Sequence, residues 1–200
     1  IKSSAASDVY KRQPFNRKEL LDITAEMEGH PDNAAPAILG GFCMALIENG
    51  NVVAERIDIP SQWKAVVAIP DFELHTEKAR AVLPASYVRS DVVHNIGAVS
   101  FLMAAFMYNK PEYLKFGLDD HVHVPYRLGL IPGSEEVIRS SVKAGAYGAT
   151  ISGSGPTIIA FSPSDKAHLV GESMVSTFKH HGITSSYIVL DFDQSGISAV

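Results

Sequence analysis

The sequence predicts an α+β fold, and two observations carry that prediction. From Lys64 onward the expected elements follow in the order strand, helices, strand, strand, helix, strand. That order is typical of the split βαβ, or ferredoxin-like, arrangement, here with extra helical residues in the first crossover. The chain has 200 residues with 46% hydrophobic content, which is enough for one sizeable core or two small ones. We therefore expect an α+β domain from about residue 59 onward, preceded by the remainder of something larger.

Each element is predicted from its periodicity and from the residues that begin and end it. A helix up to Glu28 begins at a capping box made by Asn16 and Glu19, and Asp32 or Asn33 can cap a short helix at Ala34. In the helix expected over 91–108, an apolar stripe predicts a buried face; its members are Ile96, Val99, Met103 and Phe106. Strands are expected over 42–48, 52–57, 64–69, 149–152, 157–161 and 185–190, and further helices over 76–83, 111–116, 134–144 and 163–179.

Composition and charge exclude several classes of protein. The net charge is -5 and lysine and arginine do not cluster, which argues against a nucleic-acid or anionic-membrane surface. No stretch reads as long and apolar enough to cross a membrane. The single cysteine, Cys43, excludes an internal disulfide framework and a zinc site built on thiolates. We expect Cys43 to be a small buried hydrophobe and the compartment to be the cytoplasm.

The chain divides into three predicted segments. Residues 1–13 lack helical or strand periodicity, and the string from Ser3 to Gln13 resembles translated sequencing-adapter sequence. We expect 1–13 to be a non-native or disordered leader. Residues 14–58 are then the remnant of a first domain, and residues 59–200 form the split βαβ domain.

The first motif with chemical meaning is the segment from Glu28 to Gly41. It places two carboxylates, an imidazole and an amide within six residues, directly before an apolar run. Polar groups this dense beside a buried segment usually line a pocket. The alternative is a capped turn that leads into a buried helix and has no ligand.

Two further patterns concern a glycine-rich loop and a pair of histidines. The loop at Gly153-Ser154-Gly155 lies between two predicted strands, and glycine permits close backbone approach to a phosphate or another loop. A plain strand connection uses the same residues, and the loop is not a Walker A sequence. His121 and His123 alternate, which suggests a metal site, but without a third ligand nearby we prefer partly exposed loop histidines.

Four segments together resemble the second half of the homoserine kinases, a family of the GHMP small-molecule kinase superfamily. They are Glu28–Pro36, Arg89–Asn95, Pro125–Gly133 and Gly148–Thr157, within a resemblance that covers about Phe15 to Leu190. The resemblance implies a ferredoxin-like C-terminal domain preceded by the remnant of an N-terminal ribosomal-protein-S5-like domain, which carries the His-Pro-Asp-Asn substrate segment. It also implies ATP-dependent phosphorylation of the hydroxyl of L-homoserine to O-phospho-L-homoserine, a step toward threonine.

The resemblance assigns roles to residues that match the family motifs. The cofactors implied are ATP and Mg²⁺, and an acidic residue of the motif helps to hold Mg²⁺ against the phosphates. Catalytic positions orient the hydroxyl for in-line attack, and arginines bind the substrate carboxylate. The residues are Glu28 for Mg²⁺, Asp32 and Asn33 for catalysis, His30, Asn33, Arg89 and Arg127 for substrate, and Gly153, Ser154 and Gly155 as the glycine loop.

One family feature is missing from the sequence, namely the nucleotide loop of the form Gly-Leu-Gly-Ser-Ser-Ala. We therefore expect an N-terminally truncated copy that is inactive by itself. The expected partners are L-homoserine and ATP, with no nucleic acid and no membrane, and a homodimer is a possible assembly. Two alternatives stay open: another kinase of the superfamily that acts on a different alcohol, and a non-catalytic ferredoxin-like module that binds an amino acid.

Overall fold

The computed structural model describes residues 15–197, so the leader expected over 1–13 lies outside the described residues. By their contacts the described residues form two compact units, one from residues 15–58 with 193–197 and one from residues 59–192. The end of the chain joins the first unit because its backbone pairs with the residues around Gly40. The amide of Gly41 donates to the carbonyl of Asp193 at 2.7 Å, and the amide of Ile197 donates to the carbonyl of Ile38 at 3.2 Å. The contacts thus place residues 193–197 in the first unit, whereas the sequence assigns them to the second domain, 59–200.

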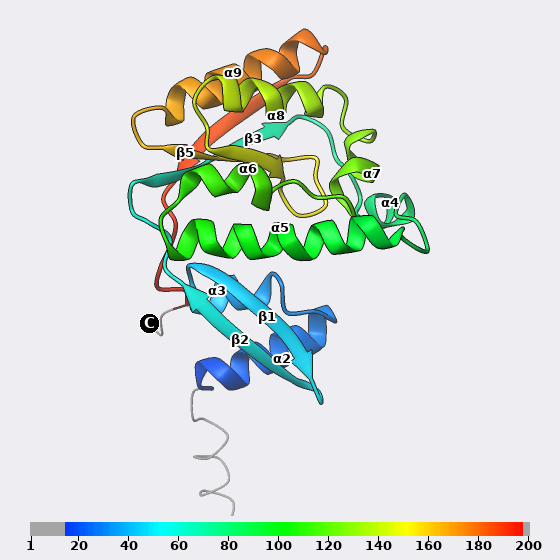
Figure 1. Ribbon diagram of the computed structural model, residues 1–200, viewed down its shortest axis with the longest axis vertical. Coiled ribbons are helices and arrows are strands. Elements are labelled where there is room, and N and C mark those ends of the chain that lie inside the picture. The colour runs from blue at the N-terminus through cyan, green and yellow to red at the C-terminus, as the bar shows by residue number, and fades with distance from the viewer. Residues whose placement is uncertain (1–14, 198–200) are drawn as a thin grey trace, which may run out of the picture. The chain divides into compact units, whose positions relative to one another are not determined.

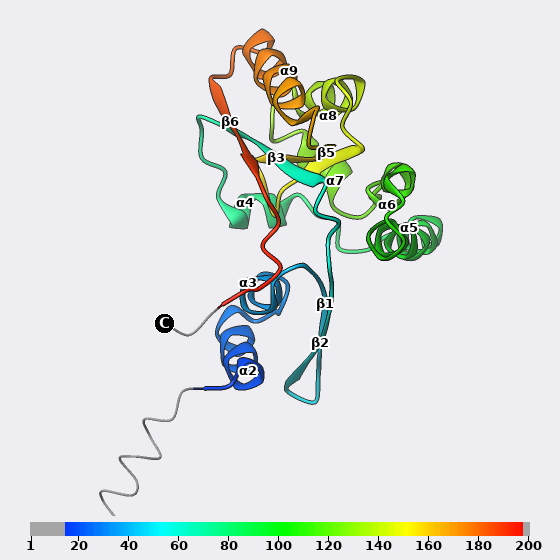
Figure 2. The same cartoon turned by 90° about the vertical axis from the view of Figure 1, so that its left-hand side faces the viewer.

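The first unit consists of two helices and a β-hairpin (Figure 1). Helix α2 (Arg17–Glu28) begins at the predicted capping box, in which Asn16 and Glu19 each accept a hydrogen bond from the other's backbone. Figure 2 shows α2 and α3 (Ala34–Leu39) on one side of strands β1 (Phe42–Glu48) and β2 (Asn51–Ile57). The hairpin turns at Asn49 and Gly50, whose φ angles are 51° and 80°. The small core of this unit contains Leu21, Ala25, Ala34, Ala35, Ile38 and Val52.

The second unit is built on a four-stranded antiparallel sheet. Its strands are β3 (Trp63–Pro70), β4 (Gly148–Ile151), β5 (Ile158–Pro163) and β6 (Ser185–Leu190), in the spatial order β4-β5-β3-β6. Every neighbouring pair is antiparallel. The α+β prediction is confirmed, and the strand order agrees with a split βαβ arrangement.

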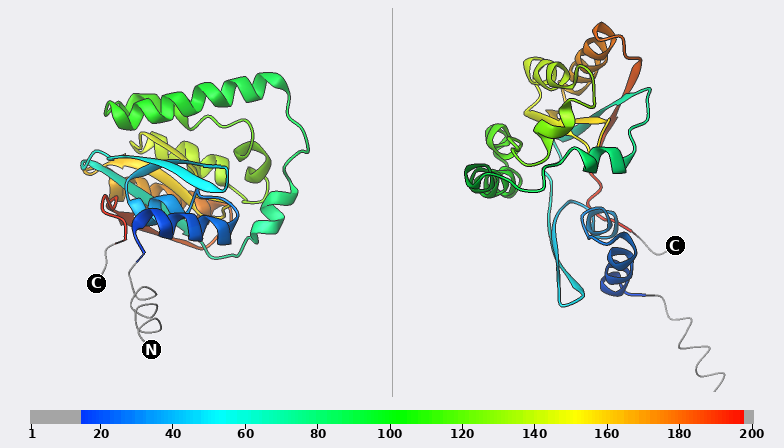
Figure 3. Two further views of the ribbon diagram at one scale, coloured as in Figure 1. Left: turned by 90° about the horizontal axis from the view of Figure 1, so that it is seen from below. Right: turned by 90° about the vertical axis from the view of Figure 1, so that its right-hand side faces the viewer.

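Helices α8 (Ser134–Lys143) and α9 (Ala167–His180) cover one face of this sheet (Figures 1 and 3). The other helical elements lie in the crossover from β3 to β4: α4 (Thr76–Ala81), α5 (Arg89–Met107), η1 (Pro111–Tyr113), α6 (Leu114–Gly117) and α7 (Val124–Leu128). Ser134 does not cap α8 with its side chain, because its hydroxyl donates to the carbonyl of Leu128. The core between sheet and helices includes Val66, Ala68, Ile131, Val137, Ile158, Ala160, Val170, Met174 and Phe178.

Helix α5 is buried at Ala98 and, toward its C-terminal end, at Ala105 and Phe106. The ring centroids of Phe106 and Trp63 are 5.3 Å apart, and the indole Nε1 of Trp63 donates a hydrogen bond to Oδ1 of Asn109. Ile96 and Val99 are instead 66% and 53% exposed. The prediction that the whole apolar stripe is a buried face is therefore wrong for these two residues.

The sequence predicts no segment long and apolar enough to cross a membrane, and helix α5 corrects this expectation. Among the described residues it is the one helix whose length and composition would allow it to cross a bilayer. A single such helix is weak evidence, since helices of water-soluble domains pass the same test. Here Phe106 belongs to an aromatic cluster with Trp63 and Phe161, which ties the helix to the sheet.

Candidate functional site

In the first unit the polar segment lies where the chain reverses between α2 and α3. Gly29 ends α2 in the left-handed conformation, with φ 82°, and its amide donates to the carbonyl of Ala25 at 2.9 Å. Pro31 is buried behind this turn, while Glu28 at the end of α2 is exposed. The sequence thus folds locally so that the polar side chains of the segment stay at the surface of the unit.

His30, Asp32 and Asn33 form one local cluster. The Nδ1 atom of His30 contacts Oδ1 of Asp32, and the same oxygen accepts the backbone N–H of Asn33 at 2.9 Å. Asn33 is the residue before α3, but its side chain makes no capping hydrogen bond. The expected side-chain cap does not form, because the amide of Ala35 donates to the carbonyl of Pro31 at 2.8 Å and Pro36 has no N–H to offer. The Asp32 carboxylate, whose side chain is 70% exposed, stays open to an incoming group.

In the second unit Arg127 is held by two backbone carbonyls. Its Nε donates to the carbonyl of Ala79 at 3.2 Å and its Nη1 to that of Gly153 at 3.1 Å. Among the described residues Arg127 takes part in no ion pair, and Glu136 pairs with Arg139 instead. The guanidinium has five N–H groups, so three remain available to an anion.

The helix that carries Arg127, α7, is fixed at its start by a carboxylate. Asp120 accepts the backbone N–H groups of Val122, His123 and Val124 at 2.7, 3.2 and 3.0 Å. It also accepts the side-chain amide of Asn95 at 2.8 Å, which links α7 to α5. Burial raises the pKa of Asp120, but these hydrogen bonds outweigh it, and the pKa lies below its ordinary value.

Sequence reasoning did not single out Asp120. The signal that could have found it is an aspartate followed a few residues later by a proline in the first turn of a helix, since such carboxylates bind free N–H groups there. The resemblance did point to Asn95, whose carbonyl oxygen accepts the backbone N–H of His121 at 2.8 Å. Asp120 and Asn95 thus position the loop before α7.

The glycine loop follows β4 and lies against α4. Gly153 and Gly155 have φ angles of 58° and 85°, and Ser154 Oγ lies 3.5 Å from Thr76 Oγ1. A Cβ on Gly155 would come within 2.7 Å of Ile131, whereas one on Gly153 would meet nothing within 4 Å. The loop is therefore closely packed at Gly155 and open at Gly153, whose carbonyl binds Arg127.

The structure brings the predicted site residues into two groups, one in each unit. Glu28, His30, Asp32 and Asn33 share the turn between α2 and α3, and Arg127 joins the glycine loop. Arg89 is the first residue of α5 and is exposed. Among the side-chain hydrogen bonds and ion pairs of the described residues, none involves Arg89.

Comparison with known proteins first identifies the protein family that part of the chain resembles. Residues 112–180 match the family model for the GHMP kinases C terminal, and these residues span η1 to α9. This part of the chain is similar to the C-terminal domain of GHMP kinases. The chain as a whole is homologous to the C-terminal part of homoserine kinases.

Three relatives illustrate the similarity. The homoserine kinase of Desulfitobacterium hafniense is 38% identical over 98% of this chain and 66% of its own length. That of Carboxydothermus hydrogenoformans is 42% identical over 96% of this chain and 62% of its own. The crystal structure of homoserine kinase from Cytophaga hutchinsonii superposes with a TM-score of 0.86 at 32% identity, over 92% of this chain and 61% of that one. The chain thus spans about 60 to 66% of the length of the relatives it matches.

Proposed function

We propose that the whole protein transfers a phosphoryl group from ATP to the hydroxyl of L-homoserine, and that this chain supplies most of the substrate site. The observation that carries the proposal is the state of Arg127. Its guanidinium is oriented by the carbonyls of Ala79 and Gly153 and has no acidic partner among the described residues. A half-buried guanidinium gains most from a carboxylate that accepts two parallel hydrogen bonds.

In this proposal the chain acts by positioning. Arg127, with Arg89 as a second cation, binds the carboxylate of homoserine. His30, Asp32 and Asn33 orient the substrate hydroxyl toward the phosphate. Phosphoryl transfer depends mainly on alignment and charge stabilisation, so the pairing of Asp32 with His30 serves to fix a hydrogen-bond acceptor.

The residues present fit the two cofactors in part. Glu28 offers an exposed carboxylate, the oxygen ligand that Mg²⁺ prefers, at the end of α2. The open backbone around Gly153 suits close approach of a polar ligand. When bound, Mg²⁺ would neutralise charge on the phosphates of ATP. The sequence does not contain the family's Gly-Leu-Gly-Ser-Ser-Ala loop, so we propose that residues outside this chain hold most of the ATP.

A chimeric enzyme tests the proposal. The portion of the Carboxydothermus hydrogenoformans homoserine kinase that this chain does not match would be joined to residues 15–200. We expect ADP release that depends on both L-homoserine and Mg²⁺, whereas the 200-residue chain alone should be slower by several orders of magnitude. Binding of ATP to the chimera, measured separately, shows that the nucleotide site is intact.

The two alternatives give different results in the same assay. A chimera that binds ATP but phosphorylates R-mevalonate or another alcohol in place of homoserine would favour a different kinase of the superfamily. One that folds, binds ATP and homoserine, and transfers nothing would favour an amino-acid-binding module. Either result would overturn the proposed activity. We also propose a cytoplasmic location and a homodimer, and sedimentation of the chimera tests the latter.

A further inference from the structure

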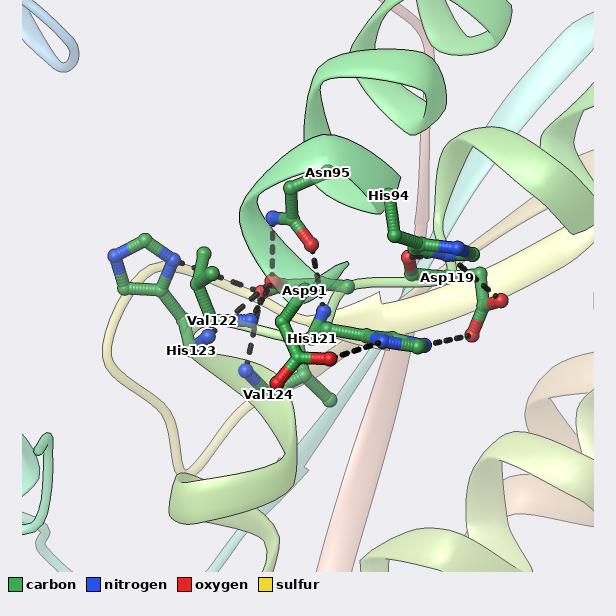
Figure 4. A network of polar contacts seen from close by, with 9 residues as sticks. Asp91, His94, Asn95, Asp119, His121, Val122, His123 and Val124 are labelled. Atoms are coloured by element: carbon green, nitrogen blue, oxygen red, sulfur yellow. Dashed lines mark hydrogen bonds and ion pairs between the residues drawn. The ribbon is translucent and has the colours of Figure 1, made fainter. Parts of the chain in front are cut away.

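Two histidines and an aspartate from distant parts of the second unit meet at the start of α5. His94 lies in the second turn of α5, and Asp119 and His121 lie in the loop between α6 and α7 (Figure 4). His94 Nε2 is 3.1 Å from Oδ2 of Asp119, and His121 Nε2 is 3.8 Å from Oδ1 of the same carboxylate. The two imidazole rings are stacked, with centroids 3.9 Å apart.

The donor atoms lie at distances that one metal ion can bridge. One ligand atom from each of the three residues lies within 4.8 Å of the other two. A tetrahedral ion with bonds of about 2.0–2.1 Å separates its ligand atoms by roughly 3.3 Å. The observed contacts of 3.1 and 3.8 Å lie on either side of that value. The two rings are nearly parallel, at 12°, and His94 Nε2 also contacts the carbonyl of Asp119, so the rings have to tilt toward a common point when all three residues bind one ion.

The surroundings hold His121 in an orientation suited to a ligand. Its Nδ1 is 3.4 Å from Oδ1 of Asp91, which lies about one turn before His94 on α5. Its backbone N–H donates to Oδ1 of Asn95. A carboxylate on one ring nitrogen fixes the proton there and leaves the lone pair of the other nitrogen for a metal. This carboxylate–histidine arrangement is the usual second layer of a metal site.

The charge of the cluster also favours a dication. Asp91 and Asp119 bring two negative charges to two imidazoles whose rings are stacked. A divalent cation beside the imidazoles balances the two carboxylates. The neighbouring Asp120 does not compete, because its oxygens accept four hydrogen bonds.

The cluster is accessible from two hollows. Asp119 and His121 line a cavity of about 430 Å³ beside α7 and α8, and His94 and Asp119 line one of about 250 Å³ against α5. The side chains of His94 and His121 are each 39% exposed. An ion can therefore enter from solvent and keep a water molecule as a further ligand.

We propose that His94, Asp119 and His121 bind a divalent transition-metal ion of the zinc class, with Asp91 orienting His121. Two imidazole nitrogens and one carboxylate suit Zn²⁺, whereas Mg²⁺ prefers oxygen ligands only. The site is distinct from the Mg²⁺ position proposed at Glu28, which belongs to the other unit. The ion would tie α5 to the loop that leads into α7.

Titration of Zn²⁺ into the purified, chelator-treated chain without a histidine tag tests this site. We expect one equivalent bound in calorimetry at pH 7.5, no displacement by millimolar Mg²⁺, and a rise in melting temperature with added zinc. His94→Asn, His121→Asn and Asp119→Asn should each weaken binding at least tenfold. Asp91→Asn should weaken it by roughly ten- to a hundredfold, as for an orienting carboxylate.

Matched controls use histidines outside the cluster. His123→Asn, two residues from His121, and His180→Asn on α9 should bind zinc as the unaltered chain does. Circular dichroism shows that each variant is folded, and Co²⁺ absorption reports the ligand field directly. If the folded chain binds no equivalent of zinc, or if His94→Asn and His121→Asn both keep the full affinity, the assignment is wrong. Should one ligand variant fail to fold, the zinc affinity of Asp91→Asn decides instead, and an unchanged affinity would count against the site.

Discussion

Arg127 shows how the environment of one residue distinguishes a structural role from a binding role. The structural alternative for this residue is a salt bridge to Asp119, Asp120 or Glu136. In the structure Asp120 accepts N–H donors, Asp119 pairs with His94 and His121, and Glu136 pairs with Arg139. None of the three neutralises Arg127. The two carbonyls that orient it carry only partial charge, which leaves most of its positive charge for a ligand.

We predict that Arg127→Lys in the chimeric enzyme raises the KM for homoserine by roughly ten- to a hundredfold and leaves the KM for ATP nearly unchanged. Lysine keeps the charge but cannot form the paired hydrogen bonds of a guanidinium. Because two hydrogen bonds to carbonyls are also lost, stability should fall by about 1–2 kcal/mol. Arg139→Lys, an exposed residue on α8, is the control for steady-state kinetics. An unchanged homoserine KM would move the carboxylate site toward Arg89.

Asp120 gives a prediction about stability and pH. Its folded-state pKa is lowered, so the ionised carboxylate stabilises the fold at pH values above the unfolded-state pKa of about 3.9. That contribution is lost as pH falls through the lower folded-state pKa. Asp120→Asn should reduce the free energy of unfolding by about 1–3 kcal/mol at pH 7, because the amide keeps only one acceptor oxygen, loses the charge and turns an NH2 group toward N–H donors.

Urea unfolding of wild type and Asp120→Asn at a series of pH values measures this effect. The difference between the two proteins should shrink as the solution becomes more acidic than pH 4, where the wild-type carboxylate takes up a proton. Asp71→Asn, at an exposed position, should show no such difference. A constant difference at every pH would mean that Asp120 stabilises α7 by shape alone.

At the scale of elements, α5 and α6 approach each other closely at one glycine. A Cβ on Gly117 would meet the backbone Cα and N of Leu102 at 2.6 and 2.7 Å, and backbone atoms cannot rotate away. Gly117→Ala must therefore separate the helices and should lower the free energy of unfolding by about 1–3 kcal/mol. Thermal and urea unfolding measure the loss.

A second glycine of the same helix pair serves as the matched comparison. Gly97 lies inside α5, and a Cβ there meets nothing within 4 Å. Gly97→Ala should stabilise the chain by about 0.5–1 kcal/mol, because alanine loses less backbone freedom in a helix. If both substitutions had the same sign, the spacing of α5 and α6 would not be the cause.

At the scale of the whole molecule, the described surface carries much apolar area on α5. Val92, Val93, Ile96 and Val99 are 41%, 59%, 66% and 53% exposed, on a helix whose C-terminal end is firmly packed. Contiguous apolar surface of this kind promotes association in water. We predict that the chain associates in a concentration-dependent way, and that Ile96→Glu with Val99→Gln reduces this.

Light scattering over a range of protein concentrations checks this prediction, with Val53→Gln on the hairpin as a control outside α5. Equal association of the double variant and the wild type would place the contact on another surface. Flotation with neutral lipid vesicles distinguishes association between copies from insertion of α5 into a bilayer, since insertion would carry the chain into the lipid fraction.

Sequence alone determined the features that depend on neighbours a few residues apart. The capping box of Asn16 and Glu19, the turn at Asn49 and Gly50, and strand β6 over 185–190 all formed as predicted. Their hydrogen bonds close over two to four residues, or their pattern repeats every second residue, so the local chain carries the information. The α+β order of elements followed from the same local signals.

Tertiary structure decided the contacts between residues far apart in the chain. Ile96 and Val99 match the pattern of a core face, yet they are exposed, because within the second unit the packing of α5 does not bury them. Arg127 meets the carbonyl of Ala79, 48 residues away, and His94 meets Asp119, 25 residues away. The sequence shows His121 but not that His94 and Asp119 lie beside it, since that depends on how α5 packs against the loop before α7. The sequence gives the chemical character of each residue, whereas the packing of distant segments decides which residues it contacts.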